Sequence, residues 1–164
     1  MTIDSDRKAA RFLASQAQEV GRVSGREPWR DVLLWMSGGR LGRRHGRPDV
    51  PELSTPWQDT VAPERTGWRQ RAANLDDEFA FSVDYVLCRR CQLGWVEAPY
   101  TMPEYERCGL ASAGLAALRI EHPAMTWHTL GGHLGESKAF WIAVGAGVPG
   151  GYQQRGLCPH ITGG

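Results

Sequence analysis

Residues 101–119 have the sequence Thr-Met-Pro-Glu-Tyr-Glu-Arg-Cys-Gly-Leu-Ala-Ser-Ala-Gly-Leu-Ala-Ala-Leu-Arg, and this stretch decides the fold. It predicts the end of a strand, a turn that contains glycine and then an alanine- and leucine-rich helix. Gly109 and Ala111 lie where the backbone turns into that helix. The first amide N–H groups of a helix lack intrahelical partners and carry partial positive charge, so small residues there let a phosphate approach the main chain. The stretch therefore predicts either a site for a phosphorylated cofactor or only a tight connection.

The residues on both sides of this stretch predict further strands and helices. Apolar residues alternate with polar ones in the expected strands, and they recur at helical spacing in the expected helices. Strands are expected at 79–87, 93–101, 125–130 and 152–157, and helices at 111–121 and 136–144. This order predicts an α/β chain, specifically an α+β mixed sheet with helices packed on it.

The first 74 residues are expected to form a helical and loop region that packs on a core of residues 75–164. A helix is expected over residues 4–21, because Asp4 or Ser5 can cap its start and its apolar residues form a stripe. A short helix or strand should follow at 29–36.

The residues around the glycine turn resemble the acyl-CoA-binding segment of the GCN5-related N-acetyltransferase (GNAT) superfamily. The resemblance rests on Pro103-Glu-Tyr105, three variable residues and Gly109-Leu-Ala111 ahead of an amphipathic helix. The family pattern Arg/Gln-x-x-Gly-x-Gly/Ala stands here as Glu106-Arg-Cys-Gly-Leu-Ala111. Residues 137–145, Ser-Lys-Ala-Phe-Trp-Ile-Ala-Val-Gly, are similar to a later helix of the family. Together the matches span residues 79–160.

The resemblance implies a GNAT-like fold and an acyl-CoA-dependent N-acetyltransferase, which moves an acetyl group from acetyl-CoA to an amine on a small molecule, a protein or an aminoacyl-tRNA. Two positions depart from the family: Glu106 replaces the usual Arg or Gln, and Trp141 replaces a Tyr that protonates the departing thiolate. Because indole cannot titrate usefully, Tyr152 or a water would take that role. The implied cofactor-binding residues are Tyr100, Thr101, Met102, Arg107, Cys108, Gly109, Leu110, Ala111 and Ser112.

Two side chains on the expected strands are candidate bases for the acceptor amine. Glu97 and His128 lie on strands whose ends line the substrate cleft in the family that this chain resembles. His has the better unperturbed pKa, whereas Glu would act through water or after burial. Each is also compatible with a plain structural role, Glu97 on the surface and His128 as a hydrogen-bonded ring. His133 is a weaker third candidate.

The cysteines predict a structural zinc site. Cys88 and Cys91 are two residues apart at an expected hairpin turn, and Cys158 and His160 lie close together near the end of the sequence. A Cys3His set is a common structural zinc site. In the acetyltransferase topology that the resemblance implies, the last strand runs antiparallel to the one before it, which would carry its end to the hairpin turn. If a short strand at 146–148 were missing, that direction would reverse and the two pairs of ligands would lie a sheet height apart. His122 is an alternative fourth ligand, and unliganded reduced thiols are the alternative to a metal.

Two other functions fit the same residues. The chain could be a catalytically degenerate GNAT-like module that binds nucleic acid or protein, or a GNAT toxin that acetylates aminoacyl-tRNA. The basic segment Arg40–Arg47 would contact nucleic acid or a protein in the first case and the tRNA phosphates in the second. Otherwise it contacts the CoA phosphates or is a solvated loop. Four prolines predict irregular structure from residue 48 to 63.

Composition limits the class of protein. The 164 residues fit one domain, the hydrophobic fraction of 41% is ordinary, and a net charge of +1 gives no global reason for nucleic-acid binding. No apolar run approaches the roughly 20 residues of a membrane helix, and the first residues lack a secretory apolar segment. We therefore expect a cytoplasmic protein without a membrane partner. The oligomeric state is not predictable from these features.

Overall fold

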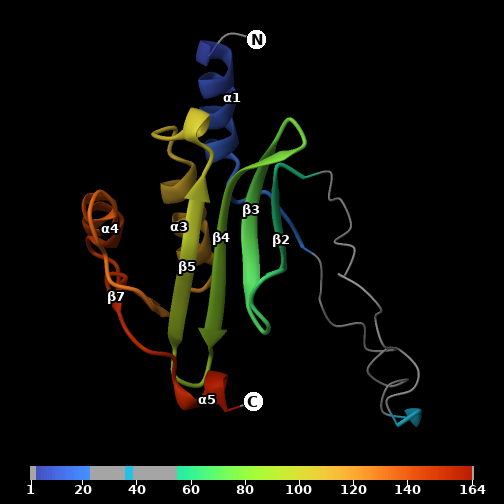
Figure 1. The fold of residues 1–164 in the computed structure, drawn as a ribbon, viewed down its shortest axis with the longest axis vertical. Coiled ribbons are helices and arrows are strands. Elements are labelled where there is room, and N and C mark those ends of the chain that lie inside the picture. Colours follow the sequence, from blue (N-terminus) through green and yellow to red (C-terminus); the bar gives the residue numbers. More distant parts are fainter. Residues whose placement is uncertain (1–2, 23–35, 39–54, 164) are drawn as a thin grey trace.

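The computed structural model describes residues 3–22, 36–38 and 55–163, and in these ranges one mixed sheet is covered by helices (Figure 1). The strands are β1 Val20–Arg22, β2 Trp57–Val61, β3 Arg69–Leu75, β4 Glu78–Cys88, β5 Leu93–Thr101, β6 Thr126–Thr129 and β7 Gln153–Gln154. The helices are α1 Ile3–Ser15, α3 Leu110–Glu121, α4 Ser137–Gly145 and α5 Pro159–Thr162, with a 3-10 turn at Pro103–Tyr105.

The seven strands follow one another through the sheet in chain order. The pairs β2–β3, β3–β4 and β4–β5 are antiparallel. The pairs β1–β2, β5–β6 and β6–β7 are parallel. The predicted mixed α/β sheet is therefore confirmed. No helix in the described part of the chain is long and apolar enough to cross a membrane.

One face of the sheet carries the main core, which α1 and α3 cover. Leu13 of α1 and Leu115 of α3 pack with Phe81 and Trp57 of the strands, and all four are buried. Gly114 is required where α3 meets the sheet, because a Cβ there would lie 2.6 Å from the Phe81 ring. The close approach holds α3 against the centre of the sheet, and this fixes where the helix begins.

A smaller core lies on the opposite face, at the turn between β4 and β5. Its buried members include Trp68, Leu93 and Trp95, and Leu157 and Ile161 of the C-terminal segment pack on them. Trp95 Nε1 donates a hydrogen bond of 2.9 Å to the backbone oxygen of Arg155. This small core holds the last residues beside the β4–β5 turn.

The structure corrects the expectation of irregular structure between residues 48 and 63. Residues 57–61 form β2, which pairs with β1 on one side and β3 on the other. Prolines are excluded from central strands because they cannot donate to the ladder, and Pro56 and Pro63 both lie outside β2. β3 was also not predicted. Residues 48–54 lie outside the described residues, as do Arg40–Arg47 and most of the element expected at 29–36.

The two ends of the described chain also differ from expectation. α1 ends at Ser15, and the last two residues of the expected helix, 20 and 21, belong to β1 instead. At the other end, the strand expected at 152–157 is reduced to the two residues of β7, which run parallel rather than antiparallel to β6.

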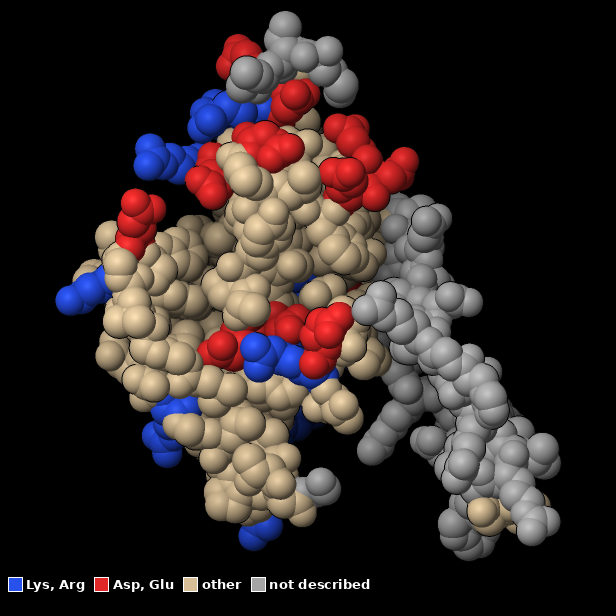
Figure 2. All heavy atoms as spheres, in the orientation of Figure 1, with Lys and Arg blue, Asp and Glu red and all other residues tan. Residues whose placement is uncertain are grey.

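Acidic side chains gather at one end of the molecule. Figure 2 shows them around the start of α1 and the turn between β3 and β4, where Asp76, Asp77 and Glu78 follow one another. A second group of mixed charge lies in the middle of this face, and the charged side chains of described residues that are visible below it are basic.

Candidate functional site

The parallel strands β5 and β6 separate part of the way along the sheet. They pair only from Leu93 to Trp95 on the β5 side, although β5 continues to Thr101. The separation coincides with a bulge: the register of β4 and β5 shifts here, and Ala98 has a positive φ of 48°. Bulges bend a strand and increase its twist, which accounts for the divergence.

The bulge decides which β5 side chains face α3. Trp95 belongs to the core on the face away from α3, and Glu97 shares that face because strand side chains alternate. The extra residue at the bulge reverses the alternation, so Thr101 pairs with Phe81 on the α3 face, whereas Tyr100 pairs with Ser82. Tyr100 is consequently 54% exposed on the other side of the sheet.

The first turn of α3 presents main-chain donors. Gly109 precedes the helix with a φ of +86°, a conformation that glycine adopts at little cost. Within the described residues, the amides of Leu110, Ala111 and Ser112 have no hydrogen-bond acceptor, whereas the next amide, that of Ala113, bonds to Gly109. These free donors give the start of α3 its partial positive charge.

A cavity of about 650 Å³ opens at this turn. Its walls come from β5, the turn before α3, the start of α3 and the start of α4. Of the nine predicted cofactor-binding residues, six line it: Thr101, Arg107, Gly109, Leu110, Ala111 and Ser112. The structure therefore gathers most of the predicted set around one cavity.

The other three predicted cofactor residues do not line the cavity. Tyr100 faces the opposite side of the sheet for the reason given above. Met102 packs against the main core, and the side chain of Cys108 is buried in it. The amide of Cys108 donates to the oxygen of Tyr105 at 3.3 Å, so it is already bonded.

Glu97 bridges the two diverging strands. Its Oε1 accepts hydrogen bonds from the amides of Leu130, at 2.5 Å, and Gly131, at 3.2 Å, just beyond the end of β6. Among the described residues, Oε2 has no hydrogen-bond partner. The carboxylate thus fixes the width of the opening between the strands and keeps one oxygen available.

His128 and Tyr152 are both buried, and neither lines the cavity. His128 Nδ1 lies 3.2 Å from the oxygen of Gln153, and burial lowers the pKa of the ring, which favours its neutral form. The Tyr152 hydroxyl accepts a 2.7 Å hydrogen bond from Arg119, and burial raises its pKa. Tyr152 therefore has no route to a thiolate in the cavity.

Trp141 lines the cavity at the position where the resemblance would place a tyrosine. Its ring packs 5.3 Å from that of Tyr152 and stacks at 4.9 Å on His133. His133 Nε2 lies 3.1 Å from the Thr129 hydroxyl. His133 does not line the cavity, but it supports the wall by stacking on Trp141.

The four predicted metal ligands lie together at the β4–β5 turn. One donor atom each from Cys88, Cys91, Cys158 and His160 lies within 4.8 Å of all the others. His160 Nδ1 is 3.2 Å from the Cys91 sulfur and 4.0 Å from that of Cys88. Ligands about 2.3 Å from a zinc ion at tetrahedral angles are separated by about 3.5–4 Å, so the spacing fits this metal.

The cluster forms although β7 runs opposite to the predicted direction. Residues 155–158 leave β7 without regular structure and return along the sheet to the β4–β5 turn, where Leu157 and Cys158 join the smaller core. Pro159 then begins α5, which places His160 beside Cys91.

The thiols of the cluster influence one another. The backbone N–H of Cys91 is the main cause that lowers the pKa of Cys88, whereas burial, reinforced by Cys88 and Cys158, raises the pKa of Cys91 to about 11. Without a cation, neighbouring thiolates repel one another. A divalent metal removes that repulsion, and its ligands are deprotonated.

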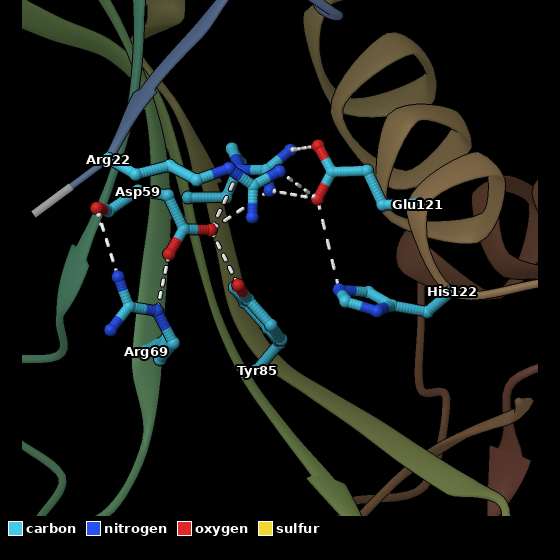
Figure 3. Close-up of polar contacts among 7 residues, drawn as sticks. Arg22, Asp59, Arg69, Tyr85, Glu121 and His122 are labelled. Carbon is cyan, nitrogen blue, oxygen red and sulfur yellow. Dashed lines mark hydrogen bonds and ion pairs between the residues drawn. The ribbon is translucent and has the colours of Figure 1, made fainter. Parts of the chain in front are cut away.

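His122, the alternative fourth ligand, lies elsewhere, in a buried ion network that the sequence did not predict (Figure 3). Arg71 is fully buried, and its Nη2 atom donates hydrogen bonds to Asp59 at 2.9 Å and to Glu121 at 2.8 Å. Burial alone would raise the pKa of Asp59, but the hydrogen bond from Tyr85 and the charge of Arg71 lower it. The network ties β2 and β3 to the end of α3.

No family model, curated protein or solved structure matches this chain. The two sites described above are therefore defined by geometry. One is a cavity whose wall combines the free amides of α3 with the side chains of Arg107, Glu106 and Glu136, and the other is a cluster built from sulfur and imidazole.

Proposed function

We propose that this protein is an acyl-CoA-dependent N-acetyltransferase that carries a structural zinc ion. One observation carries the proposal: the free amides of the first turn of α3 open on a cavity beside the place where β5 leaves β6. A helix start with free N–H groups is a general site for phosphate groups. The CoA diphosphate would lie on Leu110, Ala111 and Ser112, with Arg107 beside it.

The divergence of the strands supports the rest of the assignment. Beyond Trp95, β5 has no ladder partner on its β6 side, so its main chain is open to the amide groups of a pantetheine arm. The acceptor nitrogen, as a neutral amine, would attack the thioester carbonyl carbon, and the C–S bond would break. The proton that the attacking nitrogen then loses would pass through water to the departing thiolate, which leaves an amide and CoA. Glu97 lies on the face of the sheet away from α3 and does not line the cavity, so we assign the proton of the acceptor ammonium to its Oε2 atom by way of water in the opening between β5 and β6.

The zinc ion has a structural role in this proposal. Four protein ligands complete a tetrahedral site and leave no position for a substrate. The cluster joins the β4–β5 turn to the C-terminal segment, which covers the smaller core. The ion would thus hold the far end of β5 in place.

A second candidate function, a degenerate acetyltransferase-like module that binds nucleic acid or protein, is favoured by one observation. Trp141 lines the cavity where a proton donor is expected, and Tyr152 is fully buried behind it. Acetyl-CoA binding without transfer to any amine would support this alternative. The tRNA-directed alternative depends on Arg43 and Arg44, which lie outside the described residues, and predicts salt-sensitive RNA binding that requires them.

The proposed function is tested by acetyl-CoA affinity in a matched pair of variants. Ser112 is an exposed residue of the cavity wall in the first turn of α3. Ser112→Asp places a carboxylate where it favours the helix but repels a diphosphate, whereas Ser112→Asn keeps the size without the charge. We expect Ser112→Asp to weaken binding about tenfold or more in calorimetry and Ser112→Asn to have a smaller effect. Equal affinities for the wild type and Ser112→Asp would contradict the assignment.

A further inference from the structure

A second cavity, of about 480 Å³, adjoins the buried ion network near the β4–β5 turn. Arg22, Arg69, Arg89 and His122 make up half of its lining residues, and within the described ranges no carboxylate lines it. Tyr85 and Leu87 of β4 provide an aromatic and an aliphatic surface beside them. This cavity does not share a lining residue with the one at the start of α3.

The charges around this cavity do not balance. Arg22 and Arg71 share Glu121, each at 2.8 Å, and Arg71 and Arg69 share Asp59. Arg89 is exposed and has no carboxylate within 4.0 Å among the described residues. Among the described residues, the positive charge of Arg89 is therefore not balanced by a carboxylate at this cavity, and Arg22 shares its carboxylate with Arg71.

Two of the three arginines that line the cavity are held in place before any ligand binds, Arg22 by Glu121 and Arg69 by Asp59. Asp59 accepts hydrogen bonds from Arg69 and from the Tyr85 hydroxyl, and the Asp59 main-chain oxygen accepts a further one from Arg69 at 3.1 Å (Figure 3). A ligand therefore meets two arginines whose positions are already fixed, which reduces the ordering cost of binding, and only Arg89 has to be ordered.

His122 adds an unsatisfied polar atom to the same place. Its Nε2 atom is buried, lies 3.8 Å from Glu121 and makes no hydrogen bond in the described structure. Burial lowers the pKa of this ring, and the charges of Arg71, Arg22 and Arg89 lower it against the opposing charge of Glu121. A negatively charged ligand in the cavity would counteract the effect of those three arginines and would raise the pKa of His122.

We propose that this cavity binds a small molecule that carries a phosphate monoester, with Arg22, Arg69 and Arg89 around the dianion and its remaining part against Tyr85 and Leu87. Guanidinium groups match phosphate oxygens in geometry and bind them through charge-assisted hydrogen bonds. The volume lies within the range of about 300–1,000 Å³ that is typical of small-molecule sites. The site is independent of the proposed acetyl transfer.

The test is a titration of the full-length, metal-loaded protein with phenyl phosphate and with inorganic phosphate, followed by NMR and calorimetry. Arg89→Ala removes an arginine of the cavity, and Arg90→Ala, the matched control, removes the same charge from the adjacent exposed residue, which does not line it. We expect Arg89→Ala to raise the phenyl phosphate Kd about tenfold and Arg90→Ala to change it less than twofold. The pKa of His122 should rise when the ligand binds.

Three results would overturn this inference: no perturbation of His122 by either phosphate, equal weakening in both variants, or perturbation of the amides of residues 110–112 alone. The last result would place phosphate only at the start of α3 and would leave the proposed function standing. Conversely, a response of His122 without any acetyl-CoA binding would contradict the proposed function but support this inference. Competition by an RNA oligonucleotide that is stronger than by phenyl phosphate would overturn the small-molecule assignment.

Discussion

The cavity at the start of α3 and the cluster at the β4–β5 turn are built in different ways. The cavity offers free main-chain amides whose positions depend on Gly109 and on the bulge at Ala98, whereas the cluster depends on four specific side chains. A site made of main-chain groups tolerates changes of side chain and leaves a weak sequence signal. A site made of side chains fails when one of them is changed, and the spacing of its ligands is visible in the sequence.

The largest expected effect comes from breaking the side-chain site. Cys91→Ser removes one ligand of the cluster, and we expect loss of bound zinc and a fall in Tm of about 10 °C or more, because structural zinc contributes folding free energy directly. Cys108→Ala is the matched control, because this cysteine lies in the main core and outside the cluster. Cys108→Ala should lower the Tm only through the packing contacts of the lost sulfur atom, and the amount of bound zinc should stay unchanged.

Metal analysis and thermal unfolding measure both variants of the preceding prediction. If Cys91→Ser kept its zinc, or if a chelator left the Tm of the wild type unchanged, the cluster would not be a structural zinc site.

A smaller effect is expected at the ion network, which also depends on side chains. Asp59→Asn removes the charge that balances Arg69 and Arg71, one partly and one fully buried, so we expect a loss of about 3–5 kcal/mol in the free energy of unfolding. Asp84→Asn is the control. Burial raises the pKa of Asp84, whereas the pKa of Asp59 is lowered, so the folded protein stabilises the charge of Asp84 less than that of Asp59. Urea unfolding should show a cost below about 1 kcal/mol there. Equal costs for the two variants would show that the network is not stabilised in this way.

The sequence predicted the side-chain site well and the sheet only in part. The spacing of Cys88 and Cys91 and the glycine turn before α3 identified their elements, because both signals are local. β3 was missed because its Arg-Gln-Arg start carries the buried charge of Arg71 where an apolar residue is expected. The ion network was missed with it, since its partners come from three separate elements.

The bulge and the last strand were not predictable for a different reason. Alanine rarely adopts the positive φ found at Ala98, so no local residue type marks the bulge that turns Thr101 toward the cavity. The direction of β7 depends on how the chain leaves α4, and two residues carry too little pattern to specify it.

The smallest expected effect is the dependence of stability on pH near neutrality. Burial lowers the pKa of His128 and His122 in the folded protein, so the unfolded chain binds more protons below pH 6.5. Stability should therefore be fully present above about pH 6.5 and should decrease as the pH falls from there toward 5. Thermal unfolding across that range measures the slope, and His128→Gln should reduce it. A slope of the opposite sign would contradict the burial of neutral rings.

The central claim is that main-chain amides at the start of α3 hold the diphosphate of a CoA cosubstrate. The most direct measurement is an NMR titration of the isotope-labelled protein with CoA and, separately, with pantetheine, which lacks the diphosphate. We predict that CoA shifts the amide signals of Leu110, Ala111 and Ser112 most strongly and that pantetheine leaves them in place. CoA that left these three amides unperturbed, or perturbed only residues elsewhere, would contradict the account.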